Sequence, residues 1–325
     1  MKITLIGASG FVGTNLMRIL QENHQLKNID IETGWTFRKL TVTGDVRDGA
    51  QMDSLITDAD MVVLLAAQHR DDVTPISLYY DTNVEGMKNV LHAMQKNGIK
   101  RLLFFSSVAI YGLDKDNPNE NSPADPFNHY GKSKWQAETI LQEWYKDHRD
   151  WNIDIIRPTV IFGKGNRGNV YNLLHQLATG RFCRVGKGTN IKSMAYVENV
   201  AGFAQFLIEN VTEGYNVFNY ADKPDMDMNT LTELVCNTLG KKIPRLRLPY
   251  WLGMAGGYLF DVLSLITGHK YAISSVRVKK YCATTQYDAT KELNTEYFPP
   301  YTLKEGLLKT LDYEFISGPP SMQRD

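Results

Sequence analysis

The chain has 325 residues, of which 36 are basic and 36 are acidic, so its formal net charge is zero. A chain without an extended basic surface is a poor partner for nucleic acid. The three cysteines (183, 236 and 282) and the scattered histidines lack metal-ligand spacing, so we predict no metal ion and a reducing compartment. Alternating strand and helix patterns over this length predict one large α/β unit with a smaller second lobe.

The N-terminal segment predicts a strand, a glycine-rich turn and a helix in direct succession. Residues 2–6 form a short apolar strand, and Leu16, Ile19 and Leu20 follow helical spacing. Between them the spacing G-x-x-G-x-x-G lets the backbone approach a diphosphate at the helix N-terminus. Glycines also mark tight packing, but their place after the first strand favours a dinucleotide site. Its candidate residues are Gly7, Ser9, Gly10, Phe11, Val12 and Gly13.

Acidic residues after the next two predicted strands extend this candidate cofactor site. Residues 26–30 form the second strand, and Asp30 at its end is placed to accept hydrogen bonds from the adenosine ribose. Its charge also repels a 2′-phosphate, so we expect NAD rather than NADP. After the third strand, Asp45, which Val46 follows, could bond the adenine amino group. Both aspartates also fit a plainer interpretation as solvated turn residues.

A continuous apolar run marks the fourth strand. Residues 61–67 predict a parallel strand that is buried on both faces. Its last residues are Leu65, Ala66 and Ala67, and the small alanine side chains leave room for a cofactor. The helical pattern that follows begins at Asn83.

A serine, a tyrosine and a lysine form a candidate proton-handling set. Ser107 precedes Tyr130 by 23 residues, and Lys134 follows Tyr130 by four. Positions i and i+4 of a helix share a face, so the Lys134 ammonium can lower the pKa of the Tyr130 phenol. Such a phenol can act as a base near neutral pH, and Ser107 can hydrogen-bond the reacting oxygen. The Tyr-x-x-x-Lys spacing is common by itself, and it gains its weight from the glycine-rich turn upstream.

Together these motifs resemble the extended short-chain dehydrogenase/reductases over nearly the whole chain. The resemblance is carried by the glycine turn, Asp45, Val46, Leu65, Ala66, Ala67, Asn83, Ser107, Tyr130 and Lys134. It implies a doubly wound parallel sheet of the Rossmann type, formed by residues 1–162 and 194–222. It implies a smaller, discontinuous substrate lobe, formed by residues 163–193 and 223–325, and homodimers through helices that begin near Asn83 and Tyr130. It also implies cofactor contacts from Asn83, Tyr130, Lys134, Pro158 and Val160.

Five further stretches are similar to one branch of that family, the bacterial epimerases that act on N-acetylglucosamine carried by undecaprenyl diphosphate. They are residues 69–73, 157–163, 167–172, 193–199 and 275–280. The resemblance implies C4 inversion through a 4-keto intermediate with tightly held NAD, which yields an N-acetylgalactosamine-headed lipid for O-antigen synthesis. In that chemistry Tyr130 would move the C4 hydroxyl proton and Ser107 would orient its oxygen. Lys134 would hold the nicotinamide ribose.

Other chemistries on the same scaffold stay open as alternatives. In the resembling 4,6-dehydratases an Asp-Glu pair follows the catalytic hydroxyl residue, whereas Val108 and Ala109 stand there in this chain. A 4-ketosugar reductase usually draws on NADPH, which Asp30 disfavours. A hydroxysteroid dehydrogenase rests on fold alone, and a non-catalytic cofactor sensor would not need the intact serine, tyrosine and lysine. On substrate, the main alternative is a free UDP-GlcNAc epimerase.

A sugar diphosphate needs cationic or hydrogen-bonding partners in the second lobe. The candidate substrate residues are Ser107, Asn169, Val170, Lys192, Arg277 and Lys279. The last five lie where related epimerases contact the sugar or its phosphates, and each also fits ordinary surface. His69 and Arg70 follow the fourth strand, and they fit either a sugar contact or a cap on the next helix.

Residues 249–268 predict a very apolar helix whose one charge is Asp261. On a helical wheel Asp261, Ser264 and the glycines share one narrow stripe, and large apolar residues cover the rest. The flanking basic residues are Lys241, Lys242, Arg245, Arg247, Lys270, Arg277, Lys279 and Lys280. This pattern is typical of a helix at an anionic membrane, so we expect peripheral contact at the cytoplasmic face of the inner membrane. A helix buried in the second lobe is the alternative, and the glycines and Asp261 disfavour a spanning helix.

Overall fold

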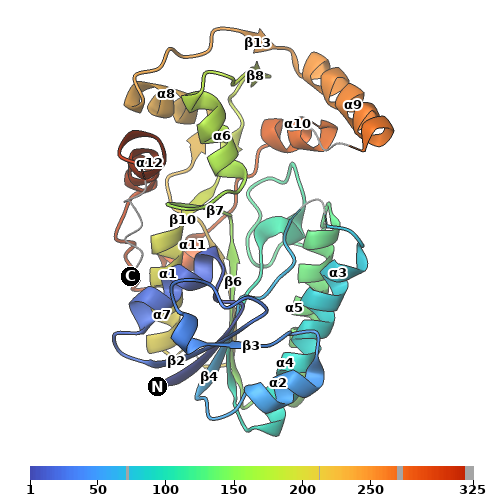
Figure 1. The fold of residues 1–325 in the computed structure, drawn as a ribbon, viewed down its shortest axis with the longest axis vertical. Helices are drawn as coiled ribbons and strands as arrows, with labels where there is room; N and C mark the ends of the chain where they lie inside the picture. Colours follow the sequence, from blue (N-terminus) through green and yellow to red (C-terminus); the bar gives the residue numbers. More distant parts are fainter. Residues whose placement is uncertain (71–72, 212, 269–273, 319–325) are drawn as a thin grey trace.

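A computed structural model describes residues 1–70, 73–211, 213–268 and 274–318. Asp71 and Asp72 of one motif, and Lys270 among the flanking basic residues, lie outside the described residues. Within the described part, a seven-stranded parallel sheet forms the centre of the larger portion of the molecule (Figure 1). Its strand order is β11 (Tyr215–Tyr220), β6 (Asn152–Pro158), β5 (Arg101–Phe105), β4 (Met61–Leu64), β1 (Lys2–Ile6), β2 (Gln25–Asp30) and β3 (Thr41–Thr43).

Helices cover both faces of this sheet. One face carries α1 (Phe11–Leu20) and α7 (Val197–Glu209), and the other carries α2 (Gly49–Leu55), α4 (Gly86–Lys96) and α5 (His129–Asp147). Along β4, Met61 and Val63 join the first core, whereas Val62 and Leu64 join the second. Because successive strand residues point to opposite faces, an unbroken apolar run is buried on both sides. The predicted doubly wound α/β fold is confirmed.

The smaller portion of the molecule packs around a core of its own. Leu174, Val235 and Leu307 lie at its centre. They come from α6 (Asn169–Ala178), α8 (Met228–Thr238) and α12 (Leu303–Leu311). Short strand pairs join its segments: β7 (Val160–Phe162) with β10 (Met194–Tyr196), β9 (Ile191–Lys192) with β12 (Met226–Asp227), and β8 (Arg184–Val185) with β13 (Arg247–Leu248). The other elements are α3 (Ser77–Tyr80), α9 (Tyr250–Thr267), α10 (Ser275–Cys282), α11 (Thr290–Leu293), η1 (Arg38–Leu40), η2 (Asp81–Glu85), η3 (Val108–Tyr111) and η4 (Asp312–Ile316).

Two predicted boundaries are wrong. The fourth strand ends at Leu64 and not at residue 67, because the N–H groups of Leu65 and Ala66 both donate to the Ile6 carbonyl and regular pairing stops there. Asn83 does not begin a helix, since it lies inside η2, a π-helical turn between α3 and α4. Both differences occur at the carboxyl end of the sheet, where the chain leaves regular structure.

The strand order places a topological switch point at β1. β1 lies between β2 and β4, so successive connections leave β1 towards opposite edges of the sheet. In open α/β sheets, ligands bind outside the carboxyl ends of the strands at such a switch point. The turn that begins at Gly7 and the segment that begins at Leu65 both follow strands at this point. The topology therefore brings two of the predicted cofactor segments together.

Asp222 and Glu292 are buried carboxyl groups next to β11. Asp222 accepts hydrogen bonds from the Tyr196 N–H at 2.6 Å and from Asn199 Nδ2 at 2.9 Å. Glu292 is 2% exposed, and its Oε2 has no hydrogen-bond partner among the described residues. Burial raises the pKa of Asp222 to about 6. Burial, reinforced by the nearby Asp222 charge, raises the pKa of Glu292 to about 8.

We expect Glu292→Gln to flatten the pH dependence of folding stability. A carboxyl group with a raised pKa keeps its proton in the folded state after the unfolded state has lost it, so stability falls as pH rises towards the folded value of about 8. Between about pH 5 and pH 8 the parent should lose on the order of 2–4 kcal/mol of unfolding free energy, and the variant much less. Urea denaturation at both pH values measures this. The control is Glu296→Gln at an exposed site, and an equal flattening in that variant would contradict the assignment.

Candidate active site

The turn between β1 and α1 has the shape of a diphosphate cradle. Gly7 has φ +84°, and a Cβ there would lie 2.5 Å from the Ala66 backbone. A Cβ on Gly13 would lie 2.3 Å from the Ala8 Cα, so α1 packs closely on the turn. Gly10 has only the Gly7 carbonyl near its Cβ position, at 3.6 Å, and no described side chain caps α1. The first N–H groups of the helix are therefore available to an anion, which fits a dinucleotide diphosphate.

Two residues of β2 hold this turn. The Asp30 Oδ2 accepts a hydrogen bond from the Ser9 N–H at 2.9 Å. The Asn28 Oδ1 accepts one from the Ala8 N–H at 3.0 Å, and Asn28 Nδ2 donates to the Ser9 Oγ at 3.0 Å. Asp30 ends β2, and its carboxylate fixes the backbone of the turn, while a ribose contact from it stays a prediction. The sequence did not indicate this role of Asn28, which is completely buried.

Asp45 is held by an ion pair with Arg47. The Arg47 Nε lies 2.9 Å from both carboxylate oxygens, and this contact lowers the pKa of Asp45. Val46 is buried and packs against Gly86 at the start of α4. The pair keeps Asp45 ionised at the loop after β3, and an adenine contact from that carboxylate stays a prediction.

A single buried amide, Asn83, joins the segment after β4 to α5. Its Oδ1 accepts from the Gln68 N–H at 2.8 Å, and its Nδ2 donates to the Gln68 carbonyl at 3.0 Å. The same Nδ2 donates to the Ser133 Oγ at 2.8 Å. Because Ser133 directly precedes Lys134, Asn83 links the strand end that carries Ala66 and Ala67 to the candidate catalytic helix. Asn83 thus holds these two segments together, a role that the sequence did not specify.

The structure brings Ser107 and the Tyr130 turn together. Ser107 follows β5 and caps η3, where its Oγ accepts from the Ala109 N–H at 3.1 Å. Tyr130 lies in the first turn of α5, which Asn128 caps through the Gly131 N–H at 2.9 Å. A Cβ on Gly131 would lie 2.5 Å from the Ala109 carbonyl oxygen, so this turn presses directly on η3. The close approach requires glycine at residue 131, next to the tyrosine.

Lys134 is almost completely buried, with 2% exposure. Its Nζ donates to the Phe105 carbonyl at 2.8 Å and lies 4.7 Å from the centroid of the Phe104 ring. Burial lowers the pKa of Lys134 to about 7, and the negative charge of Glu138 opposes that shift. The lysine therefore ties α5 to the end of β5. An effect of its charge on the pKa of Tyr130 stays a prediction.

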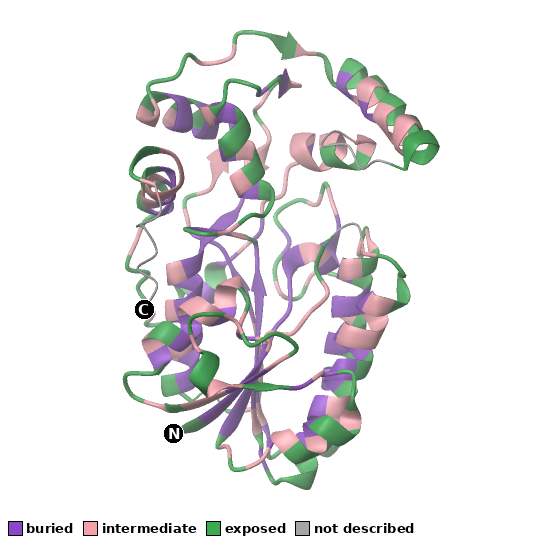
Figure 2. Cartoon of the chain, in the orientation of Figure 1, coloured by how far each residue is buried: buried purple, intermediate pink, exposed green. Residues whose placement is uncertain are grey.

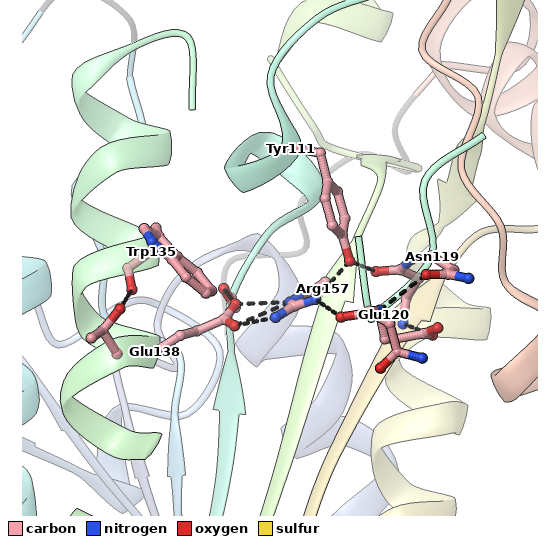
Figure 3. A network of polar contacts seen from close by, with 10 residues as sticks. Tyr111, Asn119, Glu120, Trp135, Glu138 and Arg157 are labelled. Atoms are coloured by element: carbon pink, nitrogen blue, oxygen red, sulfur yellow. Dashed lines mark hydrogen bonds and ion pairs between the residues drawn. The ribbon is translucent and has the colours of Figure 1, made fainter. Parts of the chain in front are cut away.

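Arg157 and Glu138 form a buried ion pair close in the chain to the candidate catalytic set (Figure 3). Arg157 Nη2 lies 2.5 Å from Glu138 Oε2, and its Nη1 donates to the Tyr111 Oη at 2.6 Å. Glu138 also accepts a hydrogen bond from the Ser106 Oγ. Each partner adjoins a predicted site residue: Ser106 precedes Ser107, Arg157 precedes Pro158, and Glu138 is one helical turn beyond Lys134. The four-residue spacing from Lys134 was the sequence signal for Glu138, and it was missed.

The residues predicted to contact the nicotinamide, Pro158 and Val160, come just after Arg157 in the chain. Pro158 is the buried last residue of β6, and Val160 begins β7 with 39% of its surface exposed. Between them the Thr159 N–H donates to the Tyr220 carbonyl at 3.0 Å. The chain thus passes from the sheet to the second portion with the Val160 side chain left open to a ligand.

The predicted phosphate-binding cations gather around α10, but they differ in exposure and in the contacts that their side chains make. The Lys279 Nζ lies 5.2 Å from the centroid of the Phe127 ring, just before α5 begins. Arg277 is exposed on α10. Lys192 instead donates to the carbonyls of Lys280 at 2.8 Å and Ala283 at 2.6 Å, and burial lowers its pKa to about 8. Lys192 therefore ties the end of α10 to β9.

The other predicted substrate residues lie at the N-terminus of α6. Asn169 is exposed there, whereas the Val170 side chain is buried in the core that α6 shares with α8 and α12. A ligand would thus meet the backbone of Val170 and not its side chain. On the opposite side of the site, the Arg70 carbonyl accepts from the Tyr79 hydroxyl, and the Tyr80 Oη lies 3.0 Å from His129 Nδ1. These contacts join Arg70 to α3, and α3 to His129 in the first turn of α5.

Comparison with known proteins places the chain in a family. The profile of the NAD dependent epimerase/dehydratase family matches residues 3–221, which is more than half of the chain. The chain belongs to this family. It is 59% identical over 315 residues to the N-acetyl-alpha-D-glucosaminyl-diphospho-ditrans,octacis-undecaprenol 4-epimerase of Escherichia coli O157:H7, covering 97% of this chain and 95% of that protein. It is 27% identical over 330 residues to a UDP-glucose 4-epimerase of Vibrio cholerae, covering 95% and 94%.

Solved structures of epimerase/dehydratase proteins share the fold. A UDP-N-acetylglucosamine 4-epimerase from Methanobrevibacter ruminantium M1, in complex with UDP-N-acetylmuramic acid, aligns with a TM-score of 0.76 at 20% identity, over 97% of this chain and 98% of that one. A UDP-glucose 4-epimerase from Thermotoga maritima with UDP-glucose gives the same values. The family resemblance predicted from the sequence is confirmed. The family description names NAD, so the predicted NAD cofactor is confirmed.

Proposed function

We propose that the protein is an NAD-dependent epimerase that inverts C4 of N-acetylglucosamine carried on undecaprenyl diphosphate, giving N-acetylgalactosamine. The observation that carries the proposal is 59% identity over 97% of the chain to an epimerase named for that substrate. The Ser107, Tyr130 and Lys134 set lies on adjoining elements, η3 and α5, after a strand of the same sheet that carries the glycine turn, and it supports the reaction type.

The chain's own residues divide the work as follows. Tyr130 takes the proton of the C4 hydroxyl and later returns it, since its phenol is in the first turn of α5 beside η3. Ser107 orients the C4 oxygen. Lys134, fixed on the Phe105 carbonyl, holds the nicotinamide ribose and supplies positive charge when protonated. NAD, when bound, would supply the reversible hydride-transfer chemistry that inversion at C4 requires.

We assign the remaining predicted residues by the elements that carry them. Residues 1–162 and 194–222 bind the cofactor through the turn at Gly7, Asp30, Asp45, and the segments after β4 and β6. Residues 163–193 and 223–325 bind the substrate. Arg277 and Lys279 pair with the diphosphate, with the start of α6 at Asn169 as a further contact and Lys192 holding α10 in place.

The assay that tests this proposal offers two donors to the purified protein. We expect C4 inversion of the lipid-linked N-acetylglucosamine without net oxidation of added nucleotide. Inversion of UDP-N-acetylglucosamine alone would make the protein a free-nucleotide epimerase. NADPH consumption with a 4-ketosugar, and no inversion of either donor, would make it a reductase.

We further propose a homodimer that associates through α4 and α5, and peripheral attachment to the cytoplasmic face of the inner membrane. Two long helices on one face of the sheet support the first proposal. The second proposal rests on the proposed substrate, because a polyprenyl-linked sugar is carried in the membrane.

A further inference from the structure

Helix α9 presents a broad apolar face to solvent. Eight of its large apolar side chains are between 40% and 86% exposed (Figure 2). They are Tyr250, Trp251, Leu252, Tyr258, Leu259, Val262, Leu265 and Ile266. Single exposed apolar residues are ordinary, but a contiguous set on one helix marks an interaction surface. The alternative prediction of a helix buried in the second lobe is therefore wrong.

Small residues on the opposite face hold α9 in place. Gly253 and Gly257 are the buried residues of the helix. A Cβ on Gly257 would lie 2.7 Å from the Ser275 Cα, and one on Gly253 would lie 2.5 Å from a Val185 methyl carbon. The Asp261 carboxylate accepts hydrogen bonds from Ser275, from its N–H at 3.2 Å and its Oγ at 2.5 Å. The glycine stripe thus packs on α10, and the bulky residues are left outside the core.

The chain around α9 is strongly basic. Between residues 239 and 286, Asp261 is the one acidic residue, against eight lysines and arginines. Of these, Lys241, Lys242, Arg245, Arg247 and Arg277 are exposed. Since the whole chain has equal numbers of acidic and basic residues, the rest of it is net acidic. The positive charge is therefore concentrated around the apolar face.

We propose that α9 is a membrane-docking helix that lies flat in the surface of an anionic bilayer. The apolar face of such a helix enters the boundary between headgroups and acyl chains, and the lysines and arginines around it meet anionic headgroups. Tyr250, Trp251 and Tyr258 suit this boundary, where aromatic side chains are enriched. Within the described residues, no helix combines the length and apolarity needed to cross a membrane.

Docking through α9 brings a lipid-borne diphosphate towards the catalytic helix. α10 packs against α9 on one side, and its Lys279 lies over the Phe127 ring next to the start of α5 (Figure 1). The cations of α10 thus lie on the path from the docked face to the Tyr130 turn. The delivery of a lipid-linked diphosphate rests on the proposed function. The docking of α9 on a bilayer does not depend on it.

A second copy of the chain is the other occupant that an apolar helix face can take. Two copies joined through α9 would bring their basic surroundings face to face, and like charges at an interface weaken association. Anionic headgroups neutralise the same charges. The charge distribution therefore favours the bilayer.

Flotation of the full-length protein with vesicles of phosphatidylglycerol and phosphatidylcholine tests the proposal. Leu259→Glu with Leu265→Glu places two carboxylates on the exposed face, away from α10, and should lower the vesicle-bound fraction by more than about tenfold. The control pair, Val211→Glu with Phe298→Glu, makes the same charge change at sites 53% and 85% exposed, and should float like the parent. Binding of the parent should also weaken in high salt and on phosphatidylcholine alone.

Equal flotation of the α9 variant and the parent would overturn the proposal, and so would a parent that does not float. A variant that floats normally but dissociates in analytical ultracentrifugation would assign the face to a second copy. C4 inversion of detergent-dispersed lipid-linked substrate is measured in parallel. If the α9 variant no longer floats but still inverts the dispersed substrate, the result supports docking and leaves the proposed function unaffected. If the parent floats but inverts neither donor, the result contradicts the proposed function and leaves docking unaffected.

Discussion

Tyr130→Phe should lower kcat for C4 inversion by about 10²–10⁴-fold, the usual contribution of a positioned proton-transfer group. The substitution removes only the phenol oxygen. The ring keeps its place in the first turn of α5, where Gly131 packs on the Ala109 carbonyl. The diphosphate cradle is formed by other elements, so the purified variant should still carry NAD. Steady-state assay of the lipid-linked donor and nucleotide extraction from the purified variant measure the two quantities.

Tyr80→Phe is the matched control, since it removes the same atom from a neighbouring tyrosine. The Tyr80 Oη lies 3.0 Å from His129 Nδ1 and has no part in the proposed proton transfer. We expect this variant to keep parental kcat within about threefold, because it loses no proton-transfer group. Parental kcat in a folded, NAD-loaded Tyr130→Phe protein would exclude the phenol as the base.

Glu138→Ala should destabilise the folded protein by about 3–5 kcal/mol, the cost of leaving one partner of a buried ion pair unpaired. The Glu138 and Arg157 side chains are 3% and 6% exposed, so water cannot replace the missing carboxylate. The Ser106 hydroxyl would lose its acceptor as well. Guanidinium denaturation of the variant and the parent measures the change in unfolding free energy.

The double variant Glu138→Leu with Arg157→Met separates the pair from simple loss of packing. Because it removes both charges, it should be less destabilised than Glu138→Ala, by on the order of 1–3 kcal/mol. If the destabilisation of the double variant equals the sum of those of the two single variants, the pair is not coupled.

Glu138→Gln, where it folds, should lower the pKa of Lys134 further, since the Glu138 charge in the parent opposes the effect of burial. The alkaline limb of kcat/KM would then move to lower pH.

The parts of the fold that repeat a simple pattern were predictable from the sequence. The apolar runs at residues 2–6 and 61–64 are typical of buried strands, and both form. The end of β4 was not predictable, because it depends on two N–H groups competing for the Ile6 carbonyl. Such a contact joins residues far apart in the chain, and periodicity carries no signal for it.

The site shows the same division. Spacing along one helix predicted that Tyr130 and Lys134 belong together, and the topology brings Ser107 beside them. The supporting residues Asn28, Asn83 and Glu138 act through contacts across elements, so their roles emerged only with the structure. Lys192 illustrates the converse, since a lysine that looks available to a phosphate in the sequence has its ammonium on two backbone carbonyls.

The most direct test of the account follows the C4 hydrogen of the sugar. The purified protein, without added nucleotide, is given lipid-linked N-acetylglucosamine deuterated at C4, in ordinary water. The proposed mechanism predicts an N-acetylgalactosamine product that keeps its deuterium at C4, because Tyr130 exchanges only the hydroxyl proton. Replacement of that deuterium by solvent hydrogen, or no C4 inversion by protein that carries bound NAD, would contradict it.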